Sequence, residues 1–522
     1  MIGARRWWAL GGIQVAVLAV GLDITVLSVA LPTLAGALRA SEADLQWFSS
    51  GYTLVLAAAM LPAGLLGDRY GRRKVMLVAL ALFGVGSAAC AAAPSPGVFL
   101  GARLVLGAAG AGIVVMAVSA LAVLFNEEER PRAVAVWAAA NMLAMPIGPV
   151  LGGWLLSHAW WGWVFLVNVP VALLALVVGL ALVPESWAPE RPGLDPVGVA
   201  TSSAGLVGVT YGLIEAGQDG WGDAVALGAM AAGVVVLVGF LIWERRLSRA
   251  PGGQPLIDLA LFRSTSFTWG VILVAVGTLT LTGMLFTMPQ YFQGVLGTDA
   301  MGSGLRLLPL IAGFMAGLLP AAWLARLVGA KVPTALGFAV LAAAMAVGAT
   351  TSVRSGDGFA VAWMVGAGVG MGLMFTTAAS TAVAELSAER SGVGSAMLQA
   401  LKNVGAPLGS ALAGSVLSSV YRADLRLANL PPEVAGRAEG GIFPGLALAS
   451  RVGSAGLAAS VRAAFIHGMD AALLMSAGVA VVGAVLALVF LPARPARAAV
   501  TENVGERTSQ HAKRRAVGDR AS

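Results

Sequence analysis

Asp23 is an acidic residue inside the first long apolar stretch of the chain, within the segment LDITVLSVALP at residues 22–32. An acid within a bilayer is costly and indicates a functional site by default. The chemistry that suits one enclosed carboxyl is the uptake and release of a proton, and we predict that role for Asp23. A structural acid that pairs with a neighbouring helix is the alternative interpretation.

Arg103 is a second charge within the apolar part of the chain, at the start of the fourth stretch. An arginine in this position needs a partner or a water-filled cavity. Alternatively, its long side chain reaches the membrane surface from near a helix end. Both interpretations stay open from the sequence.

A short charged loop, GLLGDRYGRRK at residues 64–74, separates the second and third apolar stretches. It contains Asp68, and its cations are Arg69, Arg72, Arg73 and Lys74. Basic loops between apolar spans mark the cytoplasmic side of a membrane. The simplest role of this loop is therefore to orient the protein.

Small residues and a proline stand together in the fifth apolar stretch, at Gly148, Pro149, Gly152 and Gly153. Glycines allow helices to approach closely, and a proline leaves one backbone carbonyl free and kinks its helix. Taken alone, this pattern is compatible with ordinary helix packing.

The composition predicts that these residues are positioned by membrane-spanning helices. Hydrophobic residues make up 58% of the chain and charged residues only 11%, against about a quarter in soluble proteins. Apolar runs of about 20 residues span a bilayer as helices. We predict an all-α membrane protein with about fourteen spans, near residues 10–36, 46–66, 75–93, 98–124, 133–156, 161–183, 196–216, 222–243, 267–290, 304–325, 333–352, 358–383, 392–418 and 468–491.

The distribution of cations predicts the orientation of the chain. Placing the N-terminus on the cytoplasmic side puts most arginines and lysines in inner loops, and an even number of spans returns the C-terminus to the same side. The exceptions on the outside are Arg39, Arg354 and five arginines between residues 421 and 466. We therefore expect a multi-pass protein of the cell membrane with both termini in the cytoplasm.

The spans divide into four expected regions. Residues 1–183 form one six-helix bundle, and 184–265 hold two additional helices and a cytoplasmic linker. Residues 266–491 form a second bundle, with a long extracellular loop at 419–466 that has room for short interfacial helices, and 492–522 form a basic, disordered tail. A twelve-span alternative drops the runs at 196–216 and 222–243. The second half weakly repeats the first, as in transporters that are built from two related halves.

Taken together, these motifs resemble the major facilitator superfamily, and within it the fourteen-helix drug:proton antiporters. Trp161–Pro170 and Lys402–Gly405 add to the resemblance, which covers roughly residues 10–491. The chain departs from the family pattern at Leu106, where a glutamine is usual, at Gly162, where an arginine is frequent, and at Lys402, where an arginine is more common.

The resemblance implies two pseudo-symmetric six-helix bundles with two extra central helices. It also implies roles: Arg103 takes part in proton coupling and biases the pKa of nearby acids, and Gly148, Pro149, Gly152 and Gly153 form the antiporter motif. The loop acts as a gate at the inner side, with Asp68 facing a helix N-terminus or a cation across the bundle. The gate residues are Gly64, Gly67, Asp68, Arg69, Gly71, Arg72 and Arg73.

The predicted activity is proton-driven export of lipophilic, often cationic, small molecules by alternating access. Candidate substrate contacts combine aromatic or thioether surface with polar tips, which suits varied ligands. They are Tyr52, Trp137, Asn141, Tyr211, Met284, Tyr291 and Phe375. An exporter dedicated to one endogenous metabolite, or an importer, remains an alternative.

Other classes of function fit the sequence less well. The pI of about 10.1 is typical of nucleic-acid binding, but the cations lie in short loops and the tail, where orientation and anionic headgroups account for them. The three histidines show no metal-ligand spacing, Cys90 has no partner for a disulfide, and no phosphate-binding loop for ATP is present. We expect no cofactor, no nucleic acid, no clustered active site of a membrane enzyme, and a monomer whose partners are lipid, protons and its substrate.

Overall fold

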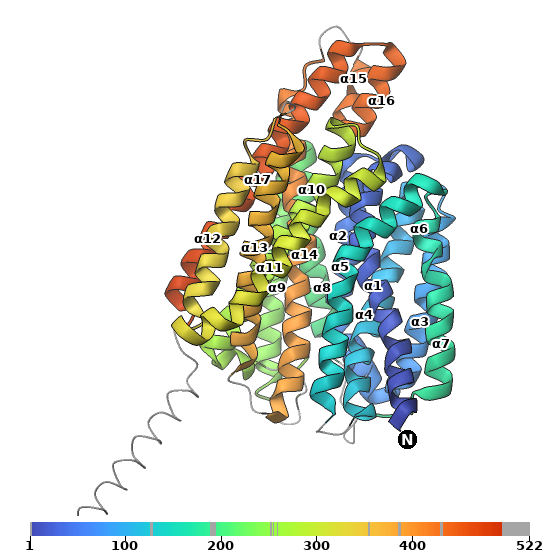
Figure 1. Ribbon diagram of the computed structural model, residues 1–522, viewed down its shortest axis with the longest axis vertical. Helices are drawn as coiled ribbons and strands as arrows, with labels where there is room; N and C mark the ends of the chain where they lie inside the picture. The colour runs from blue at the N-terminus through green and yellow to red at the C-terminus, as the bar shows by residue number, and fades with distance from the viewer. Residues whose placement is uncertain are drawn as a thin grey trace, which may run out of the picture.

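The computed structural model describes residues 3–125, 129–187, 195–250, 253, 255–257, 259–352, 355–384, 388–427 and 432–492. Within these residues the regular structure is entirely helical (Figure 1). The first group of helices is α1 (Gly3–Leu38), α2 (Glu42–Tyr70), α3 (Arg72–Ala91), α4 (Pro96–Leu124), α5 (Arg130–His158), α6 (Trp163–Leu166) and α7 (Asn168–Leu182). A hairpin follows, α8 (Pro196–Asp219) and α9 (Ala224–Leu247).

The second group follows the 3₁₀ turn η1 (Leu261–Arg263). Its members are α10 (Thr265–Gln290), the π-helical turn η2 (Tyr291–Val295), α11 (Ala300–Val328), α12 (Lys331–Gly348), α13 (Asp357–Ala384), α14 (Ala388–Asp424), α15 (Pro432–Glu439), α16 (Ile442–Val452) and α17 (Ala455–Phe490).

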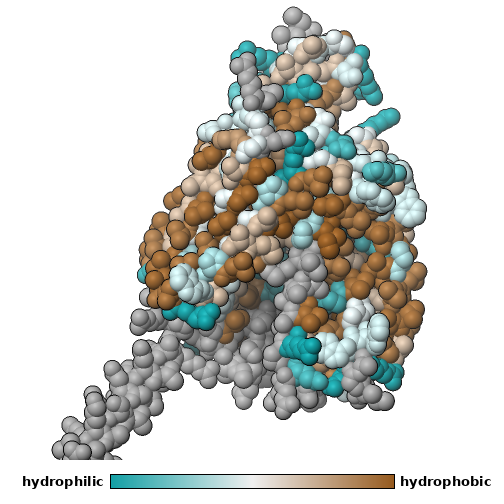
Figure 2. Space-filling view, in the orientation of Figure 1, coloured by the Kyte–Doolittle hydropathy of each residue, from teal (hydrophilic) through white to brown (hydrophobic). Residues whose placement is uncertain are grey.

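Most of the long helices can cross a bilayer. Among the described residues, thirteen helices are long and apolar enough to do so by length and composition. The 29 residues of α5 also suffice to cross about 30 Å at about 1.5 Å per residue. Figure 2 shows apolar side chains over the middle of one face and hydrophilic ones toward its two ends. The predicted all-α membrane protein with about fourteen spans is thus confirmed.

The helices pack in two groups that are joined by the α8–α9 hairpin. In the first group α1 packs on α5 and α7, and α4 packs on α2 and α3; in the second, α13 packs on α11 and α12, and α17 on α12 and α14. The α8–α9 hairpin lies against α2 and α14, one helix from each group. A polar seam between the groups runs along α2 and α14, where the hydroxyl groups of Ser50 and Ser410 lie 2.8 Å apart.

The two ends of the bundle are distinct, and we name them by what they carry. The Asp68 end holds the turn between α2 and α3, and the cap end holds the cap, which consists of α15 and α16 (Figure 1). At the Asp68 end, Arg5 near the start of α1 donates a hydrogen bond of 2.8 Å to the Ala181 carbonyl at the end of α7. Phe490 at the end of α17 stacks on Trp269 near the start of α10, with centroids 4.1 Å apart.

The predicted long loop at 419–466 requires correction. Helix α14 continues to Asp424 and α17 already begins at Ala455, so both extend beyond the expected spans. The cap fills most of the segment between them. Tyr421 ties the cap to α14, because its hydroxyl donates to the carbonyls of Ala438 at 2.8 Å and Gly441 at 3.1 Å. The apolar pattern showed only the lipid-facing part of these helices.

Candidate functional site

The two charges that the sequence singled out meet inside the first group of helices. Arg103 of α4 donates a charge-assisted hydrogen bond from Nη1 to Oδ2 of Asp23 on α1. Their residues are 1% and 4% exposed, so the pair is enclosed by protein rather than lipid. The interpretation of Arg103 as a residue that reaches the membrane surface is therefore wrong. Asp23 does have a partner on a neighbouring helix, as its structural alternative supposed.

Tyr52 of α2 completes this centre. Its ring lies under the guanidinium of Arg103, with 4.1 Å between Cζ and the ring centroid. The Nε of Arg103 donates to the carbonyl of Phe48 at 3.4 Å. Such contacts stabilise a desolvated arginine and preserve its planar orientation. Three helices thus hold one ion pair.

The centre also holds an unsatisfied polar atom. Tyr52 is 0% exposed, and its hydroxyl has no hydrogen-bond partner among the described residues. A buried hydroxyl without a partner is costly. In the structure the Tyr52 ring contacts Arg103, and the predicted substrate contact at Tyr52 stays a prediction.

The antiporter motif on α5 contacts both groups of helices. A Cβ added at Gly148 would lie 1.9 Å from Oγ1 of Thr25, and one added at Gly152 would lie 2.8 Å from Cγ1 of Val26, both on α1. Thr25 also donates to the carbonyl of Ala144 at 3.3 Å. These glycines therefore exist where α1 and α5 approach too closely for any side chain.

The other two residues of the motif face α11 of the second group. A Cβ at Gly153 would lie 2.7 Å from the carbonyl oxygen of Ala300. Reciprocally, a Cβ at Gly304 would lie 2.2 Å from the carbonyl oxygen of Pro149. At this point α5 and α11 touch through their backbones, so the motif lies at the junction of the two groups, on the side toward the cap end.

Polar contacts close the junction at the cap end. Gln293 after α10 donates to the carbonyl of Val29 on α1 at 3.0 Å. Gln290 donates to Oε1 of Glu42 at 3.1 Å, and the Glu42 amide donates to the Gly440 carbonyl of the cap at 2.8 Å. Both groups and the cap are therefore linked around Glu42, which is 3% exposed.

The Asp68 turn pairs locally rather than across the bundle. Arg72 donates to Oδ1 of Asp68 from Nε at 2.9 Å and lies 2.8 Å from it through Nη2. The expectation that Asp68 faces a helix N-terminus or a cation across the bundle is not met. Gly71 between them has a φ of 115°, a region that favours glycine.

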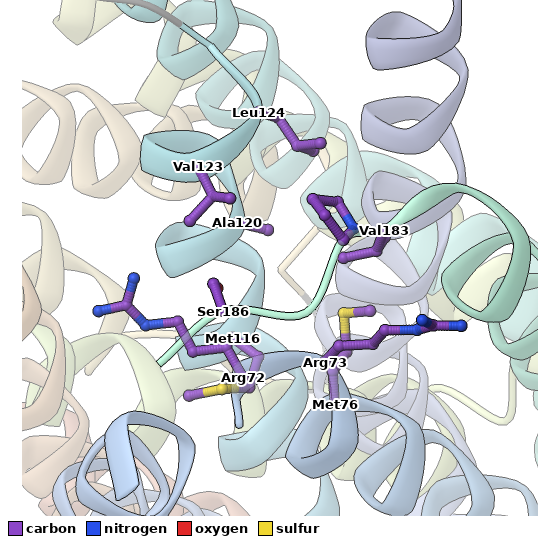
Figure 3. Close-up of a pocket in the computed structure, with 10 residues that line it drawn as sticks. Arg72, Arg73, Met76, Met116, Ala120, Val123, Leu124, Val183 and Ser186 are labelled. Atoms are coloured by element: carbon purple, nitrogen blue, oxygen red, sulfur yellow. The ribbon is translucent and has the colours of Figure 1, made fainter. Parts of the chain in front are cut away.

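Glu185 makes the contact with a helix N-terminus that we expected for Asp68. Its Oε1 accepts from the Arg73 amide at 3.1 Å, in the first turn of α3. A Cβ at Gly71 would lie 2.7 Å from the same oxygen, so the tight turn makes room for this carboxylate. The Arg72 amide donates to the Ser186 carbonyl at 2.8 Å. Figure 3 shows this segment beside the start of α3, with Arg72 and Arg73 directed to opposite sides.

Sequence reasoning missed Glu185 because it searched only within the loop motif. The available signal was an acid directly after the sixth predicted span, beside the helix start at Arg72. A carboxylate at a helix N-terminus satisfies free amides and complements the helix dipole. The other residues of the gate set, Gly64, Gly67 and Arg69, lie on the last turns of α2.

The candidate substrate contacts that the structure describes differ in their surroundings. Met284 and Tyr291 are each 1% exposed and belong to the core of the second group. Phe375 packs edge-on to Phe314, with centroids 6.0 Å apart. Tyr211 is 38% exposed on α8, toward the outside of the bundle. The side chains of Trp137 and Asn141 lie outside the described part of α5.

Lys402 of α14 is a further intramembrane charge that the site prediction left out. Among the described residues it forms no ion pair or hydrogen bond that the structure records. Its neighbour Asn403 lies against α2, with Nδ2 at 3.2 Å from Sδ of Met60. Gly405 packs on Ala275 of α10. The signal was present, because a lysine within an apolar span indicates function.

No cluster that could hold a metal occurs in the described residues, judged by groups of three or more His, Cys, Asp or Glu. The centre itself brings one acid and one cation, Asp23 and Arg103, into contact within the protein interior. Close helix contacts at Gly148 and Gly152 lie beside it, between α1 and α5.

Comparison with known proteins connects this arrangement to a family. The family model described as Major Facilitator Superfamily matches residues 14–410. The tetracenomycin C resistance and export protein of Streptomyces glaucescens is 33% identical, over 94% of this chain and 93% of its own length. The multidrug efflux pump LfrA of Mycolicibacterium smegmatis is 34% identical, over 92% and 96%.

Solved structures agree on the fold. A bacterial homologue of the human lysosomal transporter Spinster, in an inward-facing and unoccupied conformation, superposes with a TM-score of 0.66 at 16% identity, over 95% of this chain and 99% of that one. A D-xylose–proton symporter gives a TM-score of 0.59 at 14% identity, over 93% and 98%. The expected transport protein, rather than an enzyme, is confirmed: the chain belongs to the major facilitator superfamily and is related to its drug-efflux members.

Proposed function

We propose that this protein is a proton-coupled exporter of lipophilic small molecules in the cell membrane, with the Asp68 end in the cytoplasm. The observation that carries the proposal is the enclosed Asp23–Arg103 pair, held against Tyr52. The names of two relatives, an antibiotic resistance and export protein and a multidrug efflux pump, support the direction of transport and the substrate class.

The pair offers a mechanism for proton coupling. With Asp23 ionised, its charge and that of Arg103 cancel, which makes their joint burial tolerable. A proton on Asp23 removes the negative charge and leaves the guanidinium with only the Tyr52 ring and the Phe48 carbonyl. Arg103 then lacks compensation in a low dielectric, so protonation favours a different packing of α1 against α4.

The position of Asp23 links this change to the junction between the groups. Within one helical turn of Asp23 on α1, Thr25 and Val26 contact Gly148 and Gly152 of the antiporter motif. The same motif touches α11 through Pro149 and Gly153. A shift of α1 is therefore transmitted to the α5–α11 contact, which lies closed at the cap end. Rocking of the two groups around this contact gives alternating access.

The test is pH-driven efflux by Asp23→Asn in sealed proteoliposomes that contain a fluorescent lipophilic substrate. We expect efflux under an imposed pH gradient to fall at least tenfold, while downhill exchange of substrate without a gradient persists. Glu215→Gln, the same chemical change on α8, is the matched control and should behave as the unaltered protein. Undiminished gradient-driven efflux by Asp23→Asn would refute the coupling role.

An exporter of one endogenous metabolite is the second candidate, because two of the described broad-specificity contacts, Met284 and Tyr291, are buried in the core of the second group. A growth-protection panel of chemically varied toxins distinguishes the two. Protection against several unrelated compounds supports the broad exporter, and protection against one supports the dedicated exporter.

A further inference from the structure

The cap and the turn between α1 and α2 enclose a cavity of about 590 Å³. Three arginines line it: Arg39 from the turn, Arg437 from α15 and Arg451 from α16. Among the described residues that line it, none is an aspartate or a glutamate. Three cations from three different elements therefore converge on one opening.

These arginines are not neutralised by neighbours in the described structure. None of the three takes part in a recorded ion pair or side-chain hydrogen bond. Of the described acids close by in the sequence, Asp44 caps α2 together with Ser41, Glu42 accepts from Gln290, and Glu439 of α15 forms no recorded ion pair with these arginines. The charge of the cavity is thus available to a ligand.

Arg39 adds an independent observation, because its backbone is strained. Its φ of 55° is the only positive value at a non-glycine residue in the described chain. Glycine occupies this region without penalty, whereas a side chain with a Cβ raises the energy. A strained residue of this kind is a reason to look for a function of its side chain. Here that side chain lines the cavity.

The floor of the cavity is apolar, and the cavity lies at the end of a helix that can span a membrane. Phe443, Pro444 and Leu448 of α16 line it beside the arginines. Arg39 directly follows the apolar span that ends at Leu38. At the same end of the bundle, Trp160 is 52% exposed, and exposed tryptophans mark the interface between lipid tails and headgroups.

We propose that this cavity binds the phosphate group of an anionic phospholipid from the leaflet at the cap end. Arginine binds phosphate through paired N–H donors, and basic pockets beside spanning helices hold anionic headgroups. The start of an acyl chain lies along Phe443 and Leu448. The same lipid bridges the cap to the α1–α2 turn, next to the closed junction around Glu42. This site is separate from the centre at Asp23 and does not depend on the proposed transport.

The experiment measures unfolding of the purified full chain in neutral detergent. Dihexanoyl-phosphatidylglycerol, dihexanoyl-phosphatidylcholine and inorganic phosphate are titrated separately while the melting temperature is recorded. We expect saturable stabilisation by phosphatidylglycerol alone. In the variant R39G/R437Q/R451Q, half-saturation should rise at least tenfold. R426Q, an exposed arginine of the same outer segment that lies outside this cavity, should bind as the unaltered protein does.

The single variant Arg39→Gly tests whether weaker lipid binding results only from a failure to fold. Glycine relieves the backbone strain, so the lipid-free protein should melt no lower than the unaltered one, while half-saturation rises severalfold. The proposal is overturned by equal stabilisation from phosphatidylcholine, by equal weakening in R426Q, or by no stabilisation at all. Saturation by inorganic phosphate at the same concentration would assign the site to a free anion and overturn the lipid assignment.

Discussion

At the scale of single residues, the Asp23–Arg103 pair is the feature on which the proposed transport cycle depends. Removing one member of a buried pair leaves an uncompensated charge and typically costs about 3–5 kcal/mol, whereas removing both is often tolerated. The contact of Arg103 with the Tyr52 ring adds to the stability only while the guanidinium is present.

A double substitution separates stability from coupling. We expect Asp23→Asn and Arg103→Gln each to lower the midpoint of thermal unfolding, and the double variant to recover a large part of the loss, because no buried charge is left. Transport driven by a pH gradient should be absent in the double variant. If the decreases in the unfolding midpoint of the two single variants simply add in the double variant, the two side chains do not interact in the folded protein.

The positive charge of Lys402 is expected to disfavour the transport of cationic substrates. A lysine in a span without a described partner repels cations that approach α14. Lys402→Gln should therefore raise the efflux of a lipophilic cation at least twofold relative to a neutral analogue, measured with paired fluorescent substrates. An equal change for both substrates would place Lys402 away from the transport path.

At the scale of elements, the close approach of α5 and α11 determines how the two groups meet. A Cβ at Gly304 would lie 2.2 Å from the Pro149 carbonyl oxygen, so no side chain fits without parting the helices. Gly228 on α9 offers the contrast, because a Cβ there would meet nothing within 4 Å. The pair gives a matched test of the contact.

Gly304→Val should abolish closure at the cap end and reduce transport at least tenfold, while Gly228→Val should transport normally. The measurement is efflux together with solvent accessibility of a cysteine introduced near Val29. Increased labelling of that cysteine in Gly304→Val is the expected sign of an opened junction. Normal efflux by Gly304→Val would rule out this contact as a requirement for transport.

The sequence predicted the spans well because apolar length is a direct consequence of the bilayer. It placed Asp23 and Arg103 within spans but not against each other, since contacts between residues 80 positions apart depend on how helices pack. It also missed the role of Glu185 and the extensions of α14 and α17. The role of Glu185 depends on which helices pack together. The extended ends of α14 and α17 are less apolar than the spans, so hydropathy does not identify them as helical.

At the scale of the whole molecule, the distribution of charge remains the argument for orientation. The chain has one cysteine, Cys90, which is 0% exposed. Because Cys90 is buried, it should react little with thiol reagents that are applied from either side of the membrane.

Single cysteines at opposite ends test the topology. In a Cys90→Ser background, Ser450→Cys in the cap should react with an impermeant maleimide in intact cells. Ser248→Cys, after α9 at the Asp68 end, should react only after the membrane is permeabilised. Protection of Ser450→Cys together with labelling of Ser248→Cys would reverse the proposed orientation, and export would become uptake.

The α5–α11 contact has a consequence for how the protein evolves. Main chain meets main chain at Gly153 and Gly304, so this part of the contact holds no side chains that must be accommodated when residues elsewhere are exchanged. In the proposed transport cycle, substitutions along the transport path leave this part of the contact unchanged. Divergent proteins of this type can then transport different substrates by the same movement of the two groups.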